Sequence, residues 1–328
     1  MKKPFLSICI ATYNRAGFIG QTLDSISSQL DDDVELLVVD GASTDNTEDV
    51  VGQFTQKDSR IRYVRLSSKG GVDQDYDKSV ELARGEFCWL FTDDDLLKAG
   101  AISAVKSAIK EGHSLIVVNA EVRDRNLTNI LQRKRILMKD NKVYYPEELE
   151  FLFIDALSYV SFIGAVVIRR SIWLNRDRES YFGTEFVHVG VIFQKPLTST
   201  TLIIAEPYIS IRYGNARWTP RRFEISVTKW PKLVWSFEHI SDHAKRCITR
   251  QEPLRMIRTL IMERGRGAYT TQHYRDFFSA LPVARLWKIG AWLIAQLPVK
   301  ALANLLYFYC RLTGPDKLLR IYDLKSNE

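Results

Sequence analysis

The first 120 residues alternate between short apolar runs and longer segments in which apolar residues recur three and four positions apart. The short runs predict strands at 6–11, 34–39, 61–66, 86–91 and 115–118. The periodic segments predict helices at 16–30, 45–54, 73–83 and 101–110. Strands that alternate with helices indicate an α/β fold, in which a mostly parallel sheet carries helices on both faces.

The pattern changes twice after this region. A polar and basic stretch at 123–142 predicts a hairpin or loop insertion. It is followed by expected helices at 146–157 and 184–193 and expected strands at 164–168, 201–205 and 208–213, the last at a sheet edge. Helical patterns then run to the C-terminus, at 223–239, 254–266 and 277–312. We therefore expect a catalytic α/β domain over 1–215 and a helical region over 216–328.

Charge divides the chain at the same place. The residues from Arg217 onward hold 20 Lys and Arg against 9 Asp and Glu, a net charge of +11, whereas the first 216 residues hold 26 against 30, a net charge of −4. Such asymmetry favours an anionic partner for the helical region, either a membrane surface or nucleic acid. The four cysteines are scattered without Cys-x-x-Cys spacing, which fits a reducing cytosol better than a disulfide framework or a zinc site.

The apolar stretch at 277–312 is interrupted by Pro282 and Pro298 and carries four cations among its tryptophans and tyrosines. Such helices can lie in the headgroup layer of a membrane, with aromatic rings inserted and cations on lipid phosphates. No run of 18 or more apolar residues is present, so we predict peripheral membrane contact without a spanning helix. Packing on the α/β domain, or on a second copy in a homo-oligomer, is the alternative.

Three adjacent carboxylates, Asp93, Asp94 and Asp95, follow the apolar run at 86–91. Adjacent carboxylates repel each other and are costly to desolvate, and a divalent cation would relieve that repulsion. Hard oxygen ligands suit Mg²⁺ or Mn²⁺, which are usually held by one or two carboxylates together with substrate phosphates. We therefore predict a metal site with Asp93 and Asp95 as the outer pair. A solvated acidic turn that caps the next helix fits the same residues.

Polar clusters also follow the first and second predicted strands, at 12–15 and 40–45. Ligands of open parallel sheets bind at the carboxyl ends of the strands, so we expect these clusters to meet the carboxylates at one edge. The ring of Tyr13 and the carboxylate of Asp40 could then hold a nucleobase and its ribose, with a diphosphate at the cation.

The order and spacing of these segments resemble the family 2 glycosyltransferases of GT-A fold. The family's Ser-Ile-x-Ile-x-Thr-Tyr-Asn-Arg, Val-Val-Asp-(Asp/Gly)-x-Ser-x-Asp, Ala-x-Gly-Glu-(Phe/Tyr) and Asp-x-Asp patterns are matched at 7–15, 38–45, 83–87 and 93–95. The resemblance covers residues 4–120 and implies a nucleotide-sugar donor, Mn²⁺ or Mg²⁺, and inversion at the anomeric carbon. Segments 70–81 and 89–101 also look like bacterial O-antigen transferases of the abequosyltransferase type. The donor contacts that the resemblance implies are Thr12, Tyr13, Asn14, Arg15, Asp40, Asp93 and Asp94.

The sequence departs from the family pattern at two places. Many members carry Asp where this chain has Gly41, and an Asn-rich loop where this chain has the acids Asp73 and Asp75. In one interpretation, these two acids contact an unusual nucleotide-sugar donor. In the other, they are negative charges at a helix N-terminus, where the helix dipole favours acids.

Inverting transfer needs a base near the acceptor hydroxyl, on the face opposite the leaving diphosphate. The resemblance places an acidic pair well beyond the metal motif, where this chain has Glu185 followed by Phe186. Glu185 is the candidate base, against an ordinary surface carboxylate, and Asp155 is a weaker candidate. His188 is expected on the same helical face, where it could assist Glu185, contact phosphate, ligate the metal or serve as a buried structural histidine.

Arg212 lies near the end of the expected catalytic domain, close in sequence to Arg217, Arg221 and Arg222. Arginine binds phosphate through a bidentate fork, so this cluster could neutralise a donor diphosphate or a lipid-diphosphate acceptor. A solvated basic face is the alternative for each of these arginines.

Together the residues and the resemblance predict a metal-dependent glycosyltransferase on the cytoplasmic face of the membrane. The expected acceptor is a polyprenyl-linked glycan, as in O-antigen or capsule assembly. A nucleotidyltransferase would use the same metal and diphosphate, but the Gly-rich basic loop of such enzymes is absent from this sequence. No nucleic-acid recognition motif is visible either, so we expect no nucleic-acid partner. A catalytically degenerate nucleotide-binding scaffold remains an alternative.

Overall fold

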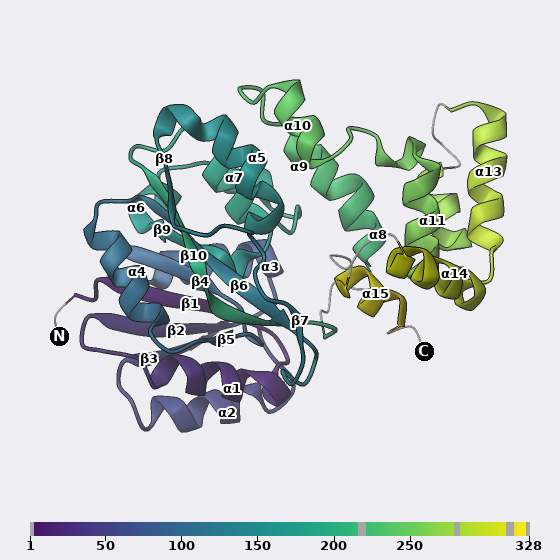
Figure 1. Cartoon of the computed structure of the whole chain (residues 1–328). Helices are drawn as coiled ribbons and strands as arrows, with labels where there is room; N and C mark the ends of the chain where they lie inside the picture. The colour runs from purple at the N-terminus through teal and green to yellow at the C-terminus, as the bar shows by residue number, and fades with distance from the viewer. Residues whose placement is uncertain (1–2, 216–220, 279–282, 313–317, 326–328) are drawn as a thin grey trace. The chain divides into compact units, whose positions relative to one another are not determined.

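The computed structural model describes residues 3–215, 221–278, 283–312 and 318–325, and contacts divide the chain into two units (Figure 1). The first unit comprises Met1–Arg212 and Phe237–Ile248, and the second comprises Tyr213–Ser236 and Thr249–Glu328. The segment Phe237–Ile248 therefore returns to the first unit, although the sequence pattern placed it in the helical region. Phe237 explains this return, because its ring centroid lies 6.1 Å from that of Phe153 and 6.4 Å from that of Phe193.

One sheet forms the centre of the first unit. Its strands are β1 (Leu6–Thr12), β2 (Val34–Asp40), β3 (Ile61–Arg65), β4 (Phe87–Phe91), β5 (Leu96–Leu97), β6 (Leu115–Arg123), β7 (Ile130–Gln132), β8 (Lys142–Tyr144), β9 (Val166–Arg169) and β10 (Thr201–Arg212). They lie in the order β3-β2-β1-β4-β9-β6-β10-β5, with β7 on β6 and β8 on β10. The four strands β1 to β4 run parallel, as do β6 and β10, while β9 is antiparallel to β4 and β6.

Helices flank this sheet on both sides (Figure 1). The helices of this unit are α1 (Ala16–Ser27), α2 (Thr47–Thr55), α3 (Val72–Leu82), α4 (Ala101–Lys110), α5 (Leu149–Val160), α6 (Arg170–Leu174), α7 (Val187–Phe193) and α10 (Asp242–Ile248), the last of which packs on α5. Helices α1 and α2 pack together, and α3 packs with α6 and α7. The predicted α/β fold class is confirmed. Strand β4, which is apolar throughout, and strand β2, which is apolar apart from Glu35 and Asp40, are buried over their whole length.

Two predicted elements differ from the structure. The expected strands at 201–205 and 208–213 form one strand, β10, which pairs with β6 on one side and with β5 and β8 on the other. The edge position was therefore wrong. The register shifts between Ile204 and Ile209, and this irregularity accommodates Pro207, which has no amide hydrogen for the ladder.

The expected helix at 184–193 begins three residues later, at Val187. Gly183 and Glu185 both adopt left-handed backbone, with φ of 82° and 72°, and a right-handed helix cannot include such residues. Glu185 therefore lies in a turn before α7, so the prediction that Glu185 and His188 share a helical face is wrong.

The second unit is helical over its described residues. Its helices are α8 (Arg222–Glu224), α9 (Trp230–Trp235), α11 (Ile257–Gly265), α12 (Thr271–His273), α13 (Arg285–Gln296), α14 (Val299–Leu312) and α15 (Leu318–Lys325). One buried cluster joins Phe223, Leu260, Tyr269 and Phe278, and a smaller one joins Ala303, Leu306, Cys310 and Leu324. Pro298 separates α13 from α14, as expected, while Pro282 lies outside the described residues.

Asp323 fastens α15 to the rest of the second unit. The Tyr213 hydroxyl donates to one carboxylate oxygen at 2.6 Å, and Arg222 and Arg266 approach the other at 2.9 and 3.5 Å. Burial and the neighbouring Asp323 raise the pKa of Tyr213 to about 12. Arg222, which the sequence placed among phosphate-binding candidates, is thus engaged inside its own unit.

Among the described residues, no single helix is long and apolar enough to cross a bilayer. The pair α13 and α14 meets the length and composition requirement jointly, with a bend of 96° between the two helices.

Candidate active site

The ends of β1 and β2 bring two of the predicted polar clusters together. Thr12 and Asp40 are paired in the β1–β2 register, and the Gly41 amide donates to the Thr12 carbonyl at 2.9 Å. Asp40 is fully buried, and its two carboxylate oxygens accept from the Ser43 amide and the Tyr63 hydroxyl, each at 2.7 Å. Burial and the hydrogen bond to Asp40 raise the pKa of Tyr63. Asp40 therefore fixes the shape of the loop after β2.

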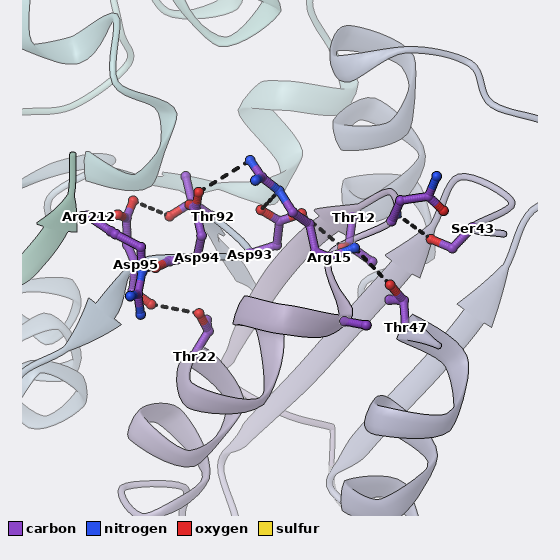
Figure 2. Close-up of polar contacts among 12 residues, drawn as sticks. Thr12, Arg15, Thr22, Ser43, Thr47, Thr92, Asp93, Asp94, Asp95 and Arg212 are labelled. Atoms are coloured by element: carbon purple, nitrogen blue, oxygen red, sulfur yellow. Dashed lines mark hydrogen bonds and ion pairs between the residues drawn. The ribbon is translucent and has the colours of Figure 1, made fainter. Parts of the chain in front are cut away.

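The loops after β1 and β2 are joined by direct hydrogen bonds. Asn14 adopts left-handed backbone with φ of 52°, a conformation that Asn tolerates better than most residues. Its side-chain oxygen accepts from the Thr44 amide at 2.6 Å, and its own amide donates to Ser43 Oγ at 2.7 Å. The Arg15 amide donates to Thr47 Oγ1 at 2.8 Å (Figure 2). Asn14 thus acts here as a structural connection between the two loops.

Tyr13 is half-buried, and the ammonium of Lys69 lies 4.0 Å from the centre of its ring. A cation at this distance from an aromatic face is a favourable cation–π contact. Sequence reasoning did not find Lys69, because it lies in a loop that matches no motif.

The carboxylate triplet follows β4 at the same edge, and the first two acids share a cation. Thr12 Oγ1 donates to Asp93 at 2.9 Å. The Arg15 guanidinium lies between two carboxylates, with Nε 3.2 Å from Asp93 and Nη2 3.3 Å from Asp94 (Figure 2). The three clusters expected at one edge are therefore held there by side-chain contacts.

Asp95 faces the opposite way, into the protein. Asp95 is only 2% exposed. Its carboxylate accepts hydrogen bonds from the Thr92 hydroxyl and, at 2.7 Å, from the Arg212 amide. Its carbonyl accepts from Thr22 at 2.8 Å (Figure 2). Burial and the neighbouring Asp94 raise the pKa of Asp95 well above its ordinary value. In this geometry Asp94, and not Asp95, shares the Arg15 guanidinium with Asp93.

The donor chemistry fits a divalent ion held partly by a ligand. Within the described ranges, no group of three or more His, Cys, Asp and Glu side chains could hold a metal on its own. An Mg²⁺ or Mn²⁺ ion that takes one or two carboxylates and completes its shell with phosphates and water needs no such group. Asp93 and Asp94 both form ion pairs with Arg15, so their carboxylates supply the one or two ligands that such an ion needs from the protein.

Arg212 joins the inner side of the triplet. Its Nε donates to the Asp94 carbonyl at 2.9 Å, and its guanidinium lies 5.3 Å from the centre of the Phe18 ring. Burial lowers the pKa of Arg212. The residue thus supports the triplet backbone in this structure. Of the other candidate arginines, Arg217 lies outside the described residues.

Asp73 holds the turn that contains Glu185. The amide of Glu185 donates to one Asp73 carboxylate oxygen at 2.8 Å, and the amide of Val187 donates to the other at 2.9 Å. Burial raises the pKa of Asp73, although both of these amides act in the opposite direction. Asp73 therefore serves as a bidentate acceptor for a turn 112 residues away in sequence. It is also an acid at a helix N-terminus, as the second interpretation of its sequence position required.

The start of α3 connects this turn with the triplet. Tyr76 lies one helical turn after Asp73, and its hydroxyl donates to the Phe91 carbonyl at 2.9 Å, two residues before Asp93. The Glu185 turn is therefore fastened to the same sheet edge as the acids. Sequence reasoning missed Tyr76 because it reads as an ordinary apolar position of a helix.

His188 is a buried structural residue in this fold. It is 1% exposed, and its Nε2 donates to the Val160 carbonyl at 2.9 Å. Burial lowers its pKa to about 4, so the ring is neutral at physiological pH. Of the roles considered from sequence, this geometry fits the structural one. Asp155, the weaker base candidate, is engaged with Lys142 at 2.8 Å and with the Tyr144 hydroxyl at 2.7 Å.

The two departures from the family pattern meet in space. A Cβ atom added to Gly41 would lie 2.8 Å from a carboxylate oxygen of Asp75, closer than side chains pack. Asp75 also accepts from the Gly70 amide at 3.1 Å, and burial raises its pKa. The carboxylate that many family members carry at position 41 is thus replaced here by one that reaches the same place from α3.

This chain resembles known proteins in sequence and in fold. The family model described as "Glycosyl transferase family 2" matches residues 7–173. An abequosyltransferase of Salmonella typhimurium is 27% identical over 71% of this chain and 75% of its own length. A PGL/p-HBAD biosynthesis glycosyltransferase of Mycobacterium bovis is 33% identical over 71% of this chain and 94% of its own length. A Campylobacter jejuni GalNAc(5)-diNAcBac-PP-undecaprenol beta-1,3-glucosyltransferase is 29% identical over 56% of this chain and 57% of its own length.

Solved structures show the same fold at low sequence identity. TarS 1–349 of S. aureus in complex with UDP covers 98% of this chain and 91% of its own, with a TM-score of 0.56 and 15% identity. The mannosyltransferase PcManGT of Pyrobaculum calidifontis, in complex with GDP-Man and Mn²⁺, covers 99% and 86%, with a TM-score of 0.55 and 17% identity. Since the family model spans half of the sequence, this chain belongs to glycosyl transferase family 2 and is a glycosyltransferase.

Proposed function

We propose that this protein transfers a sugar from a nucleotide-sugar donor to a glycan acceptor carried on a polyprenyl lipid, during synthesis of a bacterial surface polysaccharide. One observation carries the proposal: the loops after β1, β2 and β4 and the Glu185 turn are fastened to a single sheet edge. The names of the relatives from Salmonella and Campylobacter support the polysaccharide setting. The net charge of +11 from Arg217 onward supports an anionic, lipid-diphosphate acceptor.

The donor would lie across this edge. In the proposal, the Tyr13 ring stacks on the base and the loop shaped by Asp40 holds the ribose. Asp93 together with Asp94 would hold the ion, Mn²⁺ or Mg²⁺, while Asp95 would keep its hydrogen bonds to Thr92 and to the Arg212 amide. When bound, the ion offsets negative charge on the departing nucleoside diphosphate. Lys69 and Arg15 supply further positive charge on the same side.

The proposed chemistry is an inverting displacement. Glu185 takes the proton of an acceptor hydroxyl, and the oxygen attacks the anomeric carbon as its bond to the donor phosphate breaks. The step yields the glycosylated acceptor and the nucleoside diphosphate, and it leaves the proton on Glu185. Glu185 then releases this proton to solvent. Asp73 acts as a positioning residue, because it fixes the backbone from which Glu185 projects.

Glu185→Gln is the first test. A base of this kind contributes about 10²–10⁴-fold, so the variant is expected to lose that much in kcat. Nucleotide-sugar binding should be unchanged, as measured by thermal shift with UDP-, GDP-, CDP- and dTDP-sugars in the presence of Mn²⁺ or Mg²⁺. The control is Glu179→Gln, an exposed acid in the same region. Full turnover by Glu185→Gln would refute the assignment of the base, and failure of every donor to bind would refute the transferase site.

Asp73→Asn tests the positioning role. Asn offers one acceptor where the two amides need two, so we expect kcat to fall about tenfold with little change in the KM for the donor. The informative readout is a double-mutant cycle with Glu185→Gln. If Asp73 acts through Glu185, adding Asp73→Asn to Glu185→Gln should cost no further activity. Independent, multiplying losses would mean that Asp73 contacts the donor directly.

A further inference from the structure

Helix α13 has two apolar faces with different surroundings. Ala291, Ile294 and Ala295 are buried in the larger cluster of the second unit. The exposed large apolar side chains of the same helix and of the residue that follows it are Leu286, Ile289, Trp292, Leu293 and Leu297. A surface helix normally turns a polar face outward, so α13 is apolar on a side that the described chain leaves uncovered.

Helix α14 repeats this arrangement. It buries Ala303, Leu306 and Cys310 in the smaller cluster. Its exposed apolar side chains are Leu305, Phe308, Tyr309 and Leu312, which follow the helical spacing of three and four residues. Phe308 is 62% exposed and Leu312 is 87% exposed. Large apolar patches on a surface usually mark an interaction site.

Charge indicates the partner. The sequence from 277 to 312 contains no Asp or Glu, while it contains Arg285, Lys288, Lys300 and Arg311. A second copy of α13 and α14 would bring further cations and no acid to the contact, which is unfavourable. Anionic phospholipid headgroups complement these cations and leave the apolar side chains to enter the acyl boundary.

We propose that α13 and α14 together form a docking surface for the face of an anionic phospholipid bilayer. The bend of 96° suits helices that lie in the headgroup layer better than a straight crossing of the acyl layer. Trp292 and Tyr309 are amphipathic rings of the kind enriched at membrane interfaces. This inference does not depend on the proposed catalytic residues, since it concerns only the second unit.

The wild-type chain can be tested with vesicles of phosphatidylcholine alone and of phosphatidylcholine mixed with phosphatidylglycerol. We expect the protein to float with the anionic vesicles at low salt, and binding to decline as salt screens the headgroups. Binding to neutral vesicles should be at least tenfold weaker. Equal binding to both vesicle types, or none to either, would overturn the proposal.

Substitutions at exposed positions locate the surface. Lys300→Glu should weaken binding to anionic vesicles by about fivefold for each unit of charge lost. Phe308→Glu removes apolar area and adds repulsion, and should weaken binding at least about tenfold. The matched control is Leu137→Glu in the first unit, whose native side chain is 85% exposed. Control and test variants with the same vesicle affinity would exclude α13 and α14 as the contact.

Sedimentation in the absence of vesicles separates the remaining outcome. We expect the chain to have the same mass with and without Phe308→Glu. A stable oligomer that Phe308→Glu dissociates, in a protein that ignores anionic vesicles, would assign the face to a second copy and overturn the membrane proposal. Circular dichroism melting of each variant checks folding. Should Phe308→Glu unfold, the lipid and salt dependence of the wild type still decides.

Discussion

The strand-end edge of the first unit and the α13–α14 face of the second unit present opposite kinds of surface. At the edge, buried polar groups such as Asp40, Asp73 and Asp95 have both carboxylate oxygens engaged by other parts of the chain. On the helix pair, apolar side chains are exposed, and the same stretch of sequence carries cations and no acids. Hydrogen bonds are directional and select a geometry, whereas apolar area and net charge only select a kind of surface. Under the two proposals above, the first unit would select its donor by geometry, whereas the second unit would select only a kind of surface.

Asp323→Asn should have the largest effect, because it should destabilise the second unit and leave the first unit unchanged. It removes a carboxylate shared by Tyr213, Arg222 and Arg266, and breaking a buried ion pair costs about 3–5 kcal/mol. Denaturant unfolding should therefore show a lower midpoint for the second unit. Donor binding, measured by thermal shift, should persist. Loss of both properties together would show that the two units unfold as one.

Asp94→Asn and Asp95→Asn should sharpen the description of the edge. Asp94→Asn is expected to lose metal-dependent donor binding and about 10²–10³-fold in kcat, since it removes charge next to the cation position. Asp95→Asn should keep metal dependence and should not lower the melting temperature, because Asn can still accept from the Arg212 amide without a costly buried charge. Exposed Asp49→Asn is the control. The reverse pattern would restore the pairing of Asp93 with Asp95.

His188→Gln should produce the smallest effect at neutral pH. The folded pKa of about 4 lies below the ordinary value of 6.5, so His188 favours folding above pH 6.5 and this contribution is lost as pH falls towards 4. The loss is at most about 1.4 kcal/mol per pH unit. Gln keeps a donor for the Val160 carbonyl and does not titrate, so its stability curve should be flatter in this window. His243→Gln, at an exposed position, should keep the wild-type slope.

The local hydrophobic pattern of the sequence was enough to predict the strands and helices that lie around the candidate site. Strands β1, β2 and β4 are mostly apolar in sequence and are buried along nearly their entire length. Their polar ends were expected to meet, because parallel strands finish at one edge, and the register of Thr12 with Asp40 shows this. Helices α1, α3 and α4 followed from spacing alone.

What the sequence did not reveal depends on contacts between distant residues. The helix expected at 184–193 begins late because Asp73 captures the amides of Glu185 and Val187 from 112 and 114 residues away. The orientation of Asp95 depends on the Arg212 amide, 117 residues further along. Spacing rules are local, and they paired Asp95 with Asp93 as the first and third residues of an Asp-x-Asp motif. No periodicity reports which distant backbone a carboxylate will bind.

The return of Phe237–Ile248 to the first unit has a consequence for how the chain is made. A ribosome releases the chain from its N-terminus, at about 5–20 residues per second. The aromatic contacts of Phe237 with Phe153 and Phe193 can form only after residues 213–236, which belong to the second unit, have also been synthesised. The first unit therefore lacks its last segment for a few seconds of synthesis, and a gene shortened after Gly214 would encode a first unit without that segment.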